Sequence, residues 1–308
     1  MTSDEFLVEL GTRNSTLGTS FPMTRVFGVM GFPIHHSLSP VMHNAAFQAL
    51  GLDAVYAPFE VSPRHLGPVF RGLQAAGIEG LNITVPLKER IVPLLNRRDL
   101  DRSAAVIGAV NTLIRKGGRF VGYNTDVAGF RRALADALHV DCRNRRVLLL
   151  GAGGAARAVA WALAEARPEA MYVANRTASK AARLVRWLKG YASGVAVEVI
   201  PFGRKAVAEA LQDVDLLINA TSLGLRASDP LPVDPAALHR RLAVCDLVYR
   251  APTTALVREA RRRGLFAIDG LPMLIYQGAE SFRLWWRREP PVSVMRRAVE
   301  AAVHKRSP

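Results

Sequence analysis

"RRVLLLGAGGAARAVAWALAEA" occupies residues 145–166 and contains an apolar run, a glycine-rich turn and an alanine-rich stretch, in that order. The apolar run has the length of a buried strand, and the stretch after the turn has the composition of a helix. Between them, Gly151, Gly153 and Ala156 stand in a G-x-G-x-x-A spacing. In such a turn, free backbone amides and the positive end of the helix can hold a diphosphate. The segment therefore predicts a dinucleotide-binding turn, although a glycine-rich turn without a ligand would show the same spacing.

Apolar runs and helical segments continue to alternate after this turn. The runs "AMYVA", "AVEVI", "VDLLIN", "LAVCDLVY" and "LFAID" are separated by stretches of helical period. Continuous apolar strands that alternate with helices are typical of a parallel sheet with helices on both faces. Residues 126–268 are therefore predicted to form a Rossmann-type, doubly wound nucleotide domain.

The rest of the chain is long enough for a second domain, because the sequence has 308 residues. The runs "RVFGVMG", "AVYAPFEV" and "GLNITVP" predict strands, with helices between them, and indicate a second α/β domain at residues 25–125. The helical tail at 269–308 has an apolar stripe that must be buried, and we expect it to return to this second domain. Residues 1–24, rich in Gly, Ser and Thr, are expected to form a flexible tail.

Membrane insertion, secretion and metal binding find no support in the composition. No apolar run approaches the ~20 residues that cross a bilayer, and the N-terminus lacks a basic start followed by a long apolar stretch. Cys142 and Cys245 lie far apart, without a metal-binding spacing, and we expect incidental thiols in a reducing cytoplasm. These features predict a cytoplasmic protein without a membrane anchor or a metal site.

The net charge of +15 raises the alternative of a nucleic-acid-binding protein. Apart from the cluster "RRR" at 261–263, the basic residues are spread along the chain, and no helix-turn-helix, zinc-finger or RNA-binding pattern accompanies them. A diffuse positive charge also suits an enzyme whose ligands are anions. We therefore expect a small-molecule substrate and no specific nucleic acid.

The end of the second predicted strand of the nucleotide domain indicates which cofactor is bound. An NAD site usually has an acidic residue about 20 residues after the glycine-rich turn, where it binds the ribose hydroxyls. Asn175 and Arg176 stand there instead, followed by Lys180. A guanidinium group binds an additional phosphate that an acid would repel. The sequence therefore predicts NADP.

Lys88, in "GLNITVPLKER" at residues 80–90, is a candidate proton donor. Only six of the 41 basic residues are lysines, so the chain generally uses arginine for positive charge. Lysine can release a proton when its surroundings lower its pKa, whereas arginine keeps its proton. The alternative is a solvated residue in the first turn of a helix "LKERIVPLL" at 87–95.

Several motifs together resemble the shikimate dehydrogenase family, over residues 25–287. They are "GFPIHHSLSPVMHN", "NITVPLKE", "IGAVNTL", "GYNTDVAGF", "GAGGAARA", "NRT", "INATSLG", "DLVY" and "DGLPMLIYQGAESFRLW". The resemblance implies reduction of 3-dehydroshikimate to shikimate with NADPH, in the pathway to chorismate and the aromatic amino acids. It also implies a substrate domain that the nucleotide domain interrupts and the C-terminal helices complete.

The resemblance assigns roles to residues of both domains. Lys88 and Asp126 match the catalytic pair, in which a lysine and a carboxylate should titrate as a unit. The substrate ligands would be Ser37, Ser39, Thr84, Asn111, Tyr249 and Gln277. The cofactor ligands would be Gly151, Ala152, Gly153, Gly154, Ala155, Asn175, Arg176, Thr177, Lys180, Thr221, Leu247 and Gly270. Taken alone, Ser39 and Asp126 would also suit helix N-caps.

The sequence departs from the family pattern at a few places, and alternatives remain. Pro252 stands one position later than usual, Pro272 replaces a common glycine, and Leu225 replaces a frequent methionine. A quinate/shikimate dehydrogenase with relaxed cofactor use is the nearest alternative, and a regulatory or nucleic-acid-binding protein on the same fold is a distant one. We expect a monomer or a homodimer.

Overall fold

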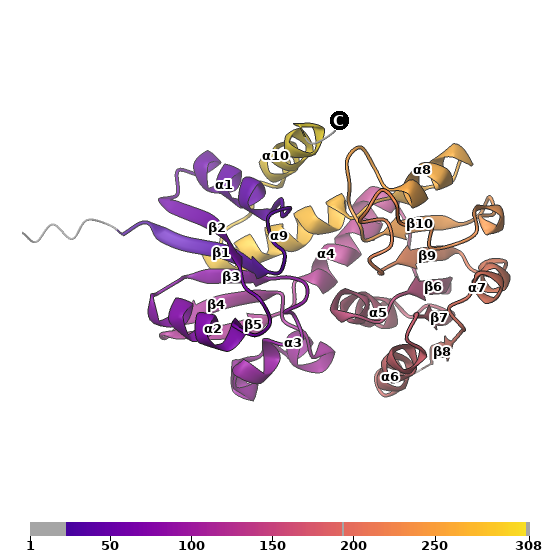
Figure 1. Ribbon diagram of the computed structural model, residues 1–308, viewed down its shortest axis with the longest axis horizontal. Coiled ribbons are helices and arrows are strands. Elements are labelled where there is room, and N and C mark those ends of the chain that lie inside the picture. Colours follow the sequence, from indigo (N-terminus) through magenta and orange to yellow (C-terminus); the bar gives the residue numbers. More distant parts are fainter. Residues whose placement is uncertain (1–22, 193, 306–308) are drawn as a thin grey trace, which may run out of the picture.

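Two β-sheets organise the residues that the computed structural model describes, which are 23–192 and 194–305. Figure 1 shows the sheets in opposite halves of the molecule. The first half contains the five-stranded sheet, and the second half contains the six-stranded sheet. Helices α4 (Asp126–Ala133) and α9 (Leu271–Trp286) pack against each other where the two halves meet.

The first sheet has the strand order β2–β1–β3–β4–β5. Its strands are β1 (Arg25–Gly31), β2 (Ala54–Glu60), β3 (Gly80–Ile83), β4 (Thr112–Lys116) and β5 (Arg119–Tyr123). β1 pairs in parallel with β2 and β3, whereas β4 runs antiparallel to both β3 and β5. Gly117 and Gly118 close the β4–β5 hairpin with φ angles of 54° and 77°, as a tight two-residue turn requires.

The second sheet is entirely parallel, with the order β11–β10–β9–β6–β7–β8. Its strands are β6 (Arg146–Leu150), β7 (Ala170–Ala174), β8 (Ala196–Val199), β9 (Leu216–Asn219), β10 (Ala243–Asp246) and β11 (Ala267–Ile268). The strand order reverses between β6 and β9, and in open parallel sheets ligands bind at the carboxyl ends of such neighbouring strands. The predicted fold class, α/β with a Rossmann-type sheet, is confirmed.

Helices cover both sheets. The remaining α-helices are α1 (Ser39–Ala49), α2 (Leu66–Ala75), α3 (Arg102–Ile107), α5 (Gly154–Ala166), α6 (Ala178–Lys189), α7 (Arg204–Leu211), α8 (Ala255–Arg262) and α10 (Val292–Lys305). Short 3₁₀ turns occupy Val92–Leu94, Arg97–Asp99 and Pro235–Ala237, and a π-helical turn, Leu134–Leu138, follows α4.

The helix considered for residues 87–95 does not form. Turns follow β3 there, and only the 3₁₀ turn at Val92–Leu94 is helical. Pro93 would lie inside that helix, where it lacks the N–H of an intrahelical hydrogen bond and its ring clashes with the preceding turn. Lys88 therefore lies in an irregular turn whose path tertiary contacts determine.

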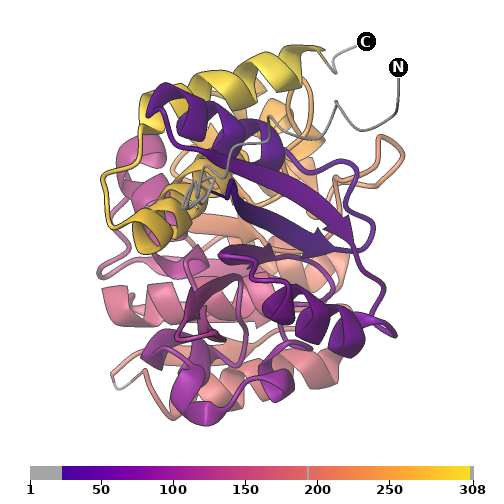
Figure 2. The same cartoon turned by 90° about the vertical axis from the view of Figure 1, so that its left-hand side faces the viewer.

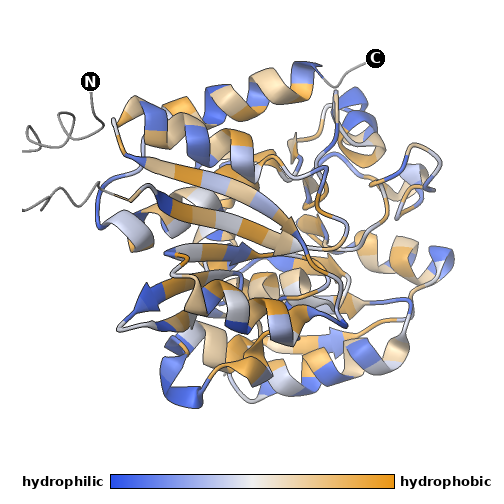
Figure 3. Ribbon diagram, turned by 60° about the vertical axis from the view of Figure 1, so that its left-hand side comes forward, coloured by the Kyte–Doolittle hydropathy of each residue, from blue (hydrophilic) through white to orange (hydrophobic). Residues whose placement is uncertain are grey.

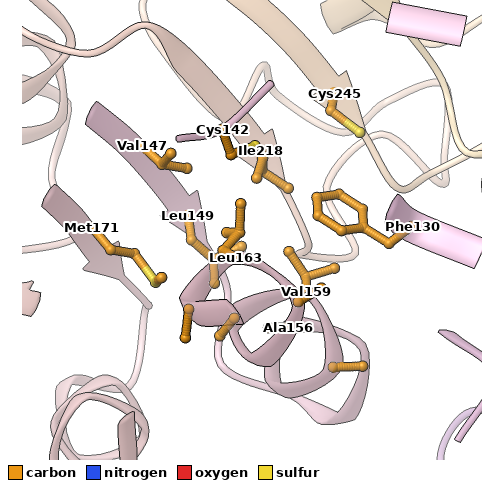
Figure 4. Packing of buried hydrophobic residues seen from close by; sticks show 14 of the residues in the cluster. Phe130, Cys142, Val147, Leu149, Ala156, Val159, Leu163, Met171, Ile218 and Cys245 are labelled. Carbon is orange, nitrogen blue, oxygen red and sulfur yellow. The ribbon is translucent and has the colours of Figure 1, made fainter. Parts of the chain in front are cut away.

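One core of the second half lies between its sheet and α5, as Figure 4 shows, and another lies between the sheet and helices α7 and α8. Ala156 is fully buried, and its small side chain lets α5 approach the strands closely. Cys142 and Cys245 belong to the same core as free thiols. Burial raises the pKa of the Cys142 thiol to about 12 and that of Cys245 further still, so both thiols stay protonated and poorly reactive at neutral pH.

The C-terminal helices pack on the first sheet. Figure 2 shows α10 lying along α1, and the indole N–H of Trp285 in α9 donates a hydrogen bond to the Leu113 carbonyl oxygen at 3.0 Å. The Trp285 ring lies 5.1 Å from the Phe27 ring. A Cβ atom on Gly80 would approach the Trp285 indole to 2.3 Å, so the chain can carry only glycine there. The final helices therefore complete the core of the first half.

Figure 3 shows apolar residues concentrated along the central strands, while the outer helices also carry hydrophilic residues. This distribution is that of amphipathic helices packed on a sheet. In residues 23–192 and 194–305, no helix combines the length and the apolar character that crossing a membrane requires.

Candidate active site

Lys88 and Asp126 lie within hydrogen-bond distance of each other. Lys88 follows β3, and Asp126 is the first residue of α4. The Lys88 Nζ atom donates to Asp126 Oδ2 at 2.6 Å, and the two side chains are only 14% and 4% exposed. Restricted access of water makes this ion pair stronger than a pair on the surface. The structure thus brings the two residues predicted as the catalytic pair into direct contact.

The alternative interpretation of Asp126 as a helix N-cap is wrong. Thr125 occupies the N-cap position of α4, and its side chain makes no capping hydrogen bond. The Asp126 carboxylate accepts hydrogen bonds from Lys88 and Asn111 instead. Its place in the first turn still lets the negative charge interact favourably with the helix dipole.

Asn111 joins this pair to Gln277 of α9. Its Nδ2 atom donates to Asp126 Oδ1 at 2.9 Å and to Gln277 Oε1 at 3.3 Å. Its Oδ1 atom accepts the backbone N–H of Thr125 at 2.7 Å. Because a backbone N–H can only donate, this contact fixes which end of the amide faces Asp126. Segments far apart in the sequence thus place Lys88, Asp126, Asn111 and Gln277 at one point.

A buried polar network below Asn111 was not predicted from the sequence. The hydroxyls of Thr112, Thr125 and Ser281 lie 2.8–3.2 Å from one another. The Asn82 amide donates to Thr112 and Ser281 at 3.1 and 2.9 Å, and the Tyr56 hydroxyl donates to Asn82 Oδ1 at 2.8 Å. All five side chains are buried, so each bond lost would leave an unsatisfied polar group. The network holds Asn111 from below.

Two signals in the sequence could have revealed part of this network. Ser281 is a polar residue within the apolar stripe of α9, and Asn82 and Thr125 stand in the motifs "NITVP" and "NTD". A polar residue at a core position needs a partner. The partner of Ser281, Thr112, is 169 residues away in the chain, so local patterns could not identify it.

Ser39 has a different local role from the one that its position predicts. Helix α1 begins at Ser39, and Leu38 occupies the N-cap position without a side-chain capping bond. The N-cap interpretation of Ser39 is therefore wrong, and its side chain instead partly offsets the rise in the pKa of the Tyr56 phenol that burial causes. Ser37 Oγ accepts the backbone N–H of Ser39 at 3.3 Å, which ties the two serines together at the start of the helix.

The structure places Thr84 and Tyr249 in two other segments. Thr84 follows β3, four residues before Lys88. Its methyl group packs against Gly31, where an added Cβ atom would lie only 2.4 Å from that methyl group. Tyr249 follows β10 and is partly buried against the apolar cluster of the first half. It therefore joins the second sheet to the half that contains Lys88.

The glycine-rich turn after β6 fits a diphosphate. Gly151 has a φ of 112°, and a Cβ atom there would lie 2.6 Å from the Ala220 carbonyl oxygen. A Cβ atom on Gly153 would meet nothing within 4 Å, so the space in front of the turn is open. Helix α5 has neither a side-chain cap nor an acid in its first turn, which leaves its first amides available for an anion.

The same turn lies against the segment that carries Lys88. A Cβ atom on Gly154 would lie 3.6 Å from Lys88 Cβ and 3.5 Å from Glu89 Oε1. Ala152 and Ala155, beside it, are partly buried. The turn predicted to bind the diphosphate and the predicted proton donor are therefore direct neighbours across the two halves.

The residues predicted to select NADP surround the start of α6. The Asn175 amide donates to the Thr177 carbonyl oxygen at 2.9 Å. Arg176 and Lys180 are exposed, and neither forms an ion pair with a described residue. The first turn of α6 contains no acid. Two available cations at the positive end of a helix fit an additional phosphate group.

Thr221, Leu247 and Gly270 lie on loops at the carboxyl ends of β9, β10 and β11. Thr221 donates through both its backbone N–H and its hydroxyl to Asn219 Oδ1, at 3.1 and 2.7 Å. A Cβ atom on Gly270 would lie 2.2 Å from the Leu247 carbonyl oxygen, so these two loops touch through their backbones. Pro272 stands in the first turn of α9, where its missing N–H costs no intrahelical bond.

Asp246, at the end of β10, supports these loops from below and was not predicted. Its Oδ1 atom accepts hydrogen bonds from the Asn219 amide at 2.8 Å and from the Val248 backbone N–H at 3.1 Å. Burial raises the pKa of this carboxyl from 3.8 to about 6, against the opposing effect of hydrogen bonds from Thr254, Val248 and Asn219. The ionised form is therefore disfavoured in the folded protein.

This raised pKa predicts how stability depends on pH. Between about pH 4 and pH 6 the folded protein binds more protons at Asp246 than the unfolded chain, so the free energy of unfolding falls as the pH rises. The cost above pH 6 is on the order of 3 kcal/mol. Asp246→Asn should therefore raise the melting temperature at pH 7.5 and lose that advantage near pH 4. Thermal unfolding at both pH values checks this, with the exposed Asp213→Asn as control. A variant less stable than the parent at both pH values would contradict it.

Arg157 and Trp187 connect the second half to α3 in the first. Arg157 Nε donates to the Ile107 carbonyl oxygen at 2.6 Å, and Trp187 Nε1 donates to the Val106 carbonyl oxygen at 3.2 Å. The Arg157 guanidinium also lies over the Trp187 ring, 4.8 Å from its centre. These donors satisfy carbonyl groups that the end of α3 leaves free. They hold the two halves together beside the glycine-rich turn.

Comparison with known proteins gives one consistent family across the chain. Residues 29–113 match the shikimate dehydrogenase substrate-binding domain, and residues 133–248 match shikimate/quinate 5-dehydrogenase. Residues 270–300 match the shikimate 5'-dehydrogenase C-terminal domain. A curated shikimate dehydrogenase (NADP(+)) from Rubrobacter xylanophilus is 48% identical over 278 residues, which cover 90% of this chain and 95% of that protein.

Solved structures with the same fold include one enzyme in complex with NADP(H) and another in complex with NAD. Shikimate dehydrogenase from Thermus thermophilus, in complex with NADP(H) and shikimate, aligns with a TM-score of 0.80 and 38% identity. Quinate dehydrogenase from Corynebacterium glutamicum, in complex with NAD, aligns with a TM-score of 0.81 and 32% identity. Each alignment covers 90% of this chain and 99% of the other.

Proposed function

The chain belongs to the shikimate dehydrogenase family, and from this premise we propose how its residues divide the work of the reaction. The protein is an NADP-dependent oxidoreductase that interconverts 3-dehydroshikimate and shikimate. The observation that carries our proposal is the Lys88–Asp126 ion pair, which is nearly shielded from water and whose lysine lies beside the turn predicted to bind the diphosphate.

Lys88 supplies the proton in this proposal. The cofactor contributes a hydride when it is bound, and reduction of a ketone leaves negative charge on the oxygen. An ammonium group can protonate that oxygen, and in the reverse direction the amine can remove the proton from the hydroxyl. Asp126 keeps Lys88 Nζ in place through the 2.6 Å contact and presents a carboxylate oxygen to the substrate hydroxyl beside it. Both side chains are nearly shielded from water, which favours direct proton transfer.

The remaining polar residues hold the substrate. Asn111 and Gln277, whose amides lie 3.3 Å apart, are suited to bind adjacent hydroxyl or carbonyl oxygens. Ser37 and Ser39, at the start of α1, would bind the carboxylate with help from the positive end of that helix. Thr84 and Tyr249 would contact the substrate from the turn after β3 and the loop after β10.

Residues along the carboxyl edge of the second sheet would hold the cofactor. The amides of residues 151–155 would bind the diphosphate, and Arg176 and Lys180, with Asn175 and Thr177 beside them, would bind the 2′-phosphate. Thr221, Leu247 and Gly270 line the nicotinamide half, where their loops meet. We further propose a substrate domain at 25–125, completed by 269–308, and a nucleotide domain at 126–268.

We also propose a cytoplasmic enzyme that acts as a monomer or a homodimer. The buried, free thiols of Cys142 and Cys245 suit a reducing compartment.

The function is tested by measuring activity with each of two substrates in combination with each of two cofactors. Oxidation of shikimate or quinate with NADP⁺ or NAD⁺ is followed by absorbance at the nicotinamide band. We expect shikimate with NADP⁺ to give the highest kcat/KM, with NAD⁺ at least about tenfold lower because it lacks the charge-assisted phosphate contacts. A preference for quinate with NAD⁺ would instead assign this chain the activity named for the Corynebacterium glutamicum protein.

A further inference from the structure

A carboxylate of the first half lies beside the turn that we propose as the diphosphate site. Glu89 follows Lys88 in the segment after β3. A Cβ atom on Gly154 would lie 3.5 Å from Glu89 Oε1 and 3.8 Å from Glu89 Cγ. Gly154 is the first residue of α5, at the end of the glycine-rich turn. The side chain of Glu89 therefore spans the boundary between the two halves and brings a negative charge to the start of α5.

No hydrogen bond holds the Glu89 carboxylate in this position. The side chain is exposed, and among residues 23–192 and 194–305 it forms neither a hydrogen bond nor an ion pair. Asp126, by contrast, is buried and accepts hydrogen bonds from Lys88 and Asn111. Because no such contact has to break, Glu89 can leave the start of α5 at little cost when another anion arrives there.

The groups around Glu89 are electropositive. Helix α5 begins without a side-chain cap and without an acid in its first turn, so the positive end of its dipole faces this carboxylate. Arg157 belongs to the same first turn and is half-buried. Burial lowers the pKa of Arg157, and the negative charge of Glu89 partly opposes that shift. Glu89 thus lowers the free energy of a region whose other charges are positive.

A bound diphosphate needs the same positive groups. It carries two negative charges and would accept hydrogen bonds from the first amides of α5. Two anions at one helix start repel each other, and each reduces the attraction that the other gains from the helix dipole and from Arg157. Glu89 and the diphosphate therefore compete for the same electrostatic stabilisation.

We propose that Glu89 is an internal competitor of the cofactor, whose carboxylate balances the positive start of α5 in the free enzyme and is displaced when the diphosphate binds. This inference rests on the proposed function, because it takes the glycine-rich turn as the diphosphate site. Glu89 weakens the binding of NADP(H) and NAD(H) by the same factor, since both contain the diphosphate, whereas Arg176 acts on the 2′-phosphate alone. The residue next to the proton donor thus sets how readily the cofactor exchanges after each turnover.

Equilibrium binding of NADPH and of NADH to the full-length enzyme without substrate tests this proposal, with nicotinamide fluorescence as the readout. Glu89→Gln keeps the shape of the side chain and removes its charge, so it should lower both dissociation constants by about two- to fivefold. The effect is modest because water screens an exposed charge. It should shrink as the salt concentration rises from about 0.05 M to about 0.5 M, since the Debye length falls over this range.

Thermal unfolding gives an independent readout of the same competition. Free Glu89→Gln should melt below the free parent enzyme, because the start of α5 has lost a favourable negative charge. At one NADPH concentration far above both dissociation constants, the cofactor should raise the melting temperature of Glu89→Gln by about 1–3 °C more than that of the parent. An equal or smaller rise in the variant would contradict displacement of Glu89 by the diphosphate.

Glu300→Gln is the matched control, because Glu300 is an exposed glutamate of α10 that forms no ion pair with a described residue. It should leave both dissociation constants unchanged. Weaker binding to Glu89→Gln would make Glu89 a cofactor ligand, and unchanged binding would show that its carboxylate does not oppose the diphosphate. Either result overturns this inference and leaves the proposed function intact. A parent enzyme that binds neither NADPH nor NADH would instead overturn the proposed function, and this inference with it.

Discussion

Replacement of Lys88 by arginine should lower turnover by roughly 10²–10⁴-fold, the usual worth of general acid–base catalysis. Arginine keeps the positive charge and can still reach Asp126, so electrostatic attraction to the substrate oxygen persists. It cannot release a proton at neutral pH, because its pKa is above about 12. The loss of turnover therefore isolates proton transfer from charge.

Steady-state kinetics with shikimate and NADP⁺ measure this effect, and the KM for NADP⁺ should stay nearly unchanged. Lys116→Arg is the matched control, because Lys116 is an exposed lysine of the same half that donates to the Tyr123 hydroxyl. Lys88→Ala should be at least as slow as Lys88→Arg. Near-normal turnover of Lys88→Arg across the pH range would mean that Lys88 is a binding cation and that the proposed mechanism is wrong.

Arg176→Ala should raise the KM for NADPH by roughly ten- to a hundredfold. A charge-assisted contact with a phosphate contributes about 1.5–3 kcal/mol, and each 1.4 kcal/mol corresponds to a factor of about ten in affinity. Arg176 forms no ion pair with a described residue, so its removal leaves no carboxylate unpaired. The change should therefore act on the 2′-phosphate and spare the fold.

NADH provides the internal control for this prediction, since it lacks the 2′-phosphate and its kinetics should barely change. Arg183→Ala controls for the general loss of a positive charge on α6, because Arg183 is exposed on the same helix. Lys180→Ala should show a smaller effect in the same direction as Arg176→Ala. An equal loss for NADPH and NADH would make Arg176 a structural residue and remove it from the proposed phosphate site.

Local sequence patterns predicted the parts of the protein that depend on neighbouring residues. The run at 147–150, the glycines at 151 and 153 and the small Ala156 belong to one strand–turn–helix unit, whose geometry follows from chain stiffness and the absence of side chains. The absence of an acid near Arg176 also predicted NADP, because the residues that determine this choice lie next to one another at the start of one helix. The fold class and the cofactor could therefore be inferred before any tertiary contact was known.

Residues that satisfy one another across the chain could not be found in this way. Tyr56, Asn82, Thr112 and Ser281 come from four different elements, and only the packed core shows that they hydrogen-bond beneath Asn111. Taken alone, Ser39 would also suit the N-cap of α1, but the helix begins at Ser39 and Leu38 occupies the N-cap position.

The two kinds of information differ because they come from interactions of different range. Backbone stiffness, helix dipoles and hydrophobic period act over a few residues, so local patterns were sufficient for the glycine-rich turn and the parallel sheet. The pairing of Lys88 with Asp126 was instead expected from the resemblance to a family. The 2.6 Å contact between those two side chains, the orientation of Asn111 and the unpaired oxygen of Asp246 arise from burial among distant segments. Burial removes water as a partner, and only the folded arrangement determines which protein group replaces it.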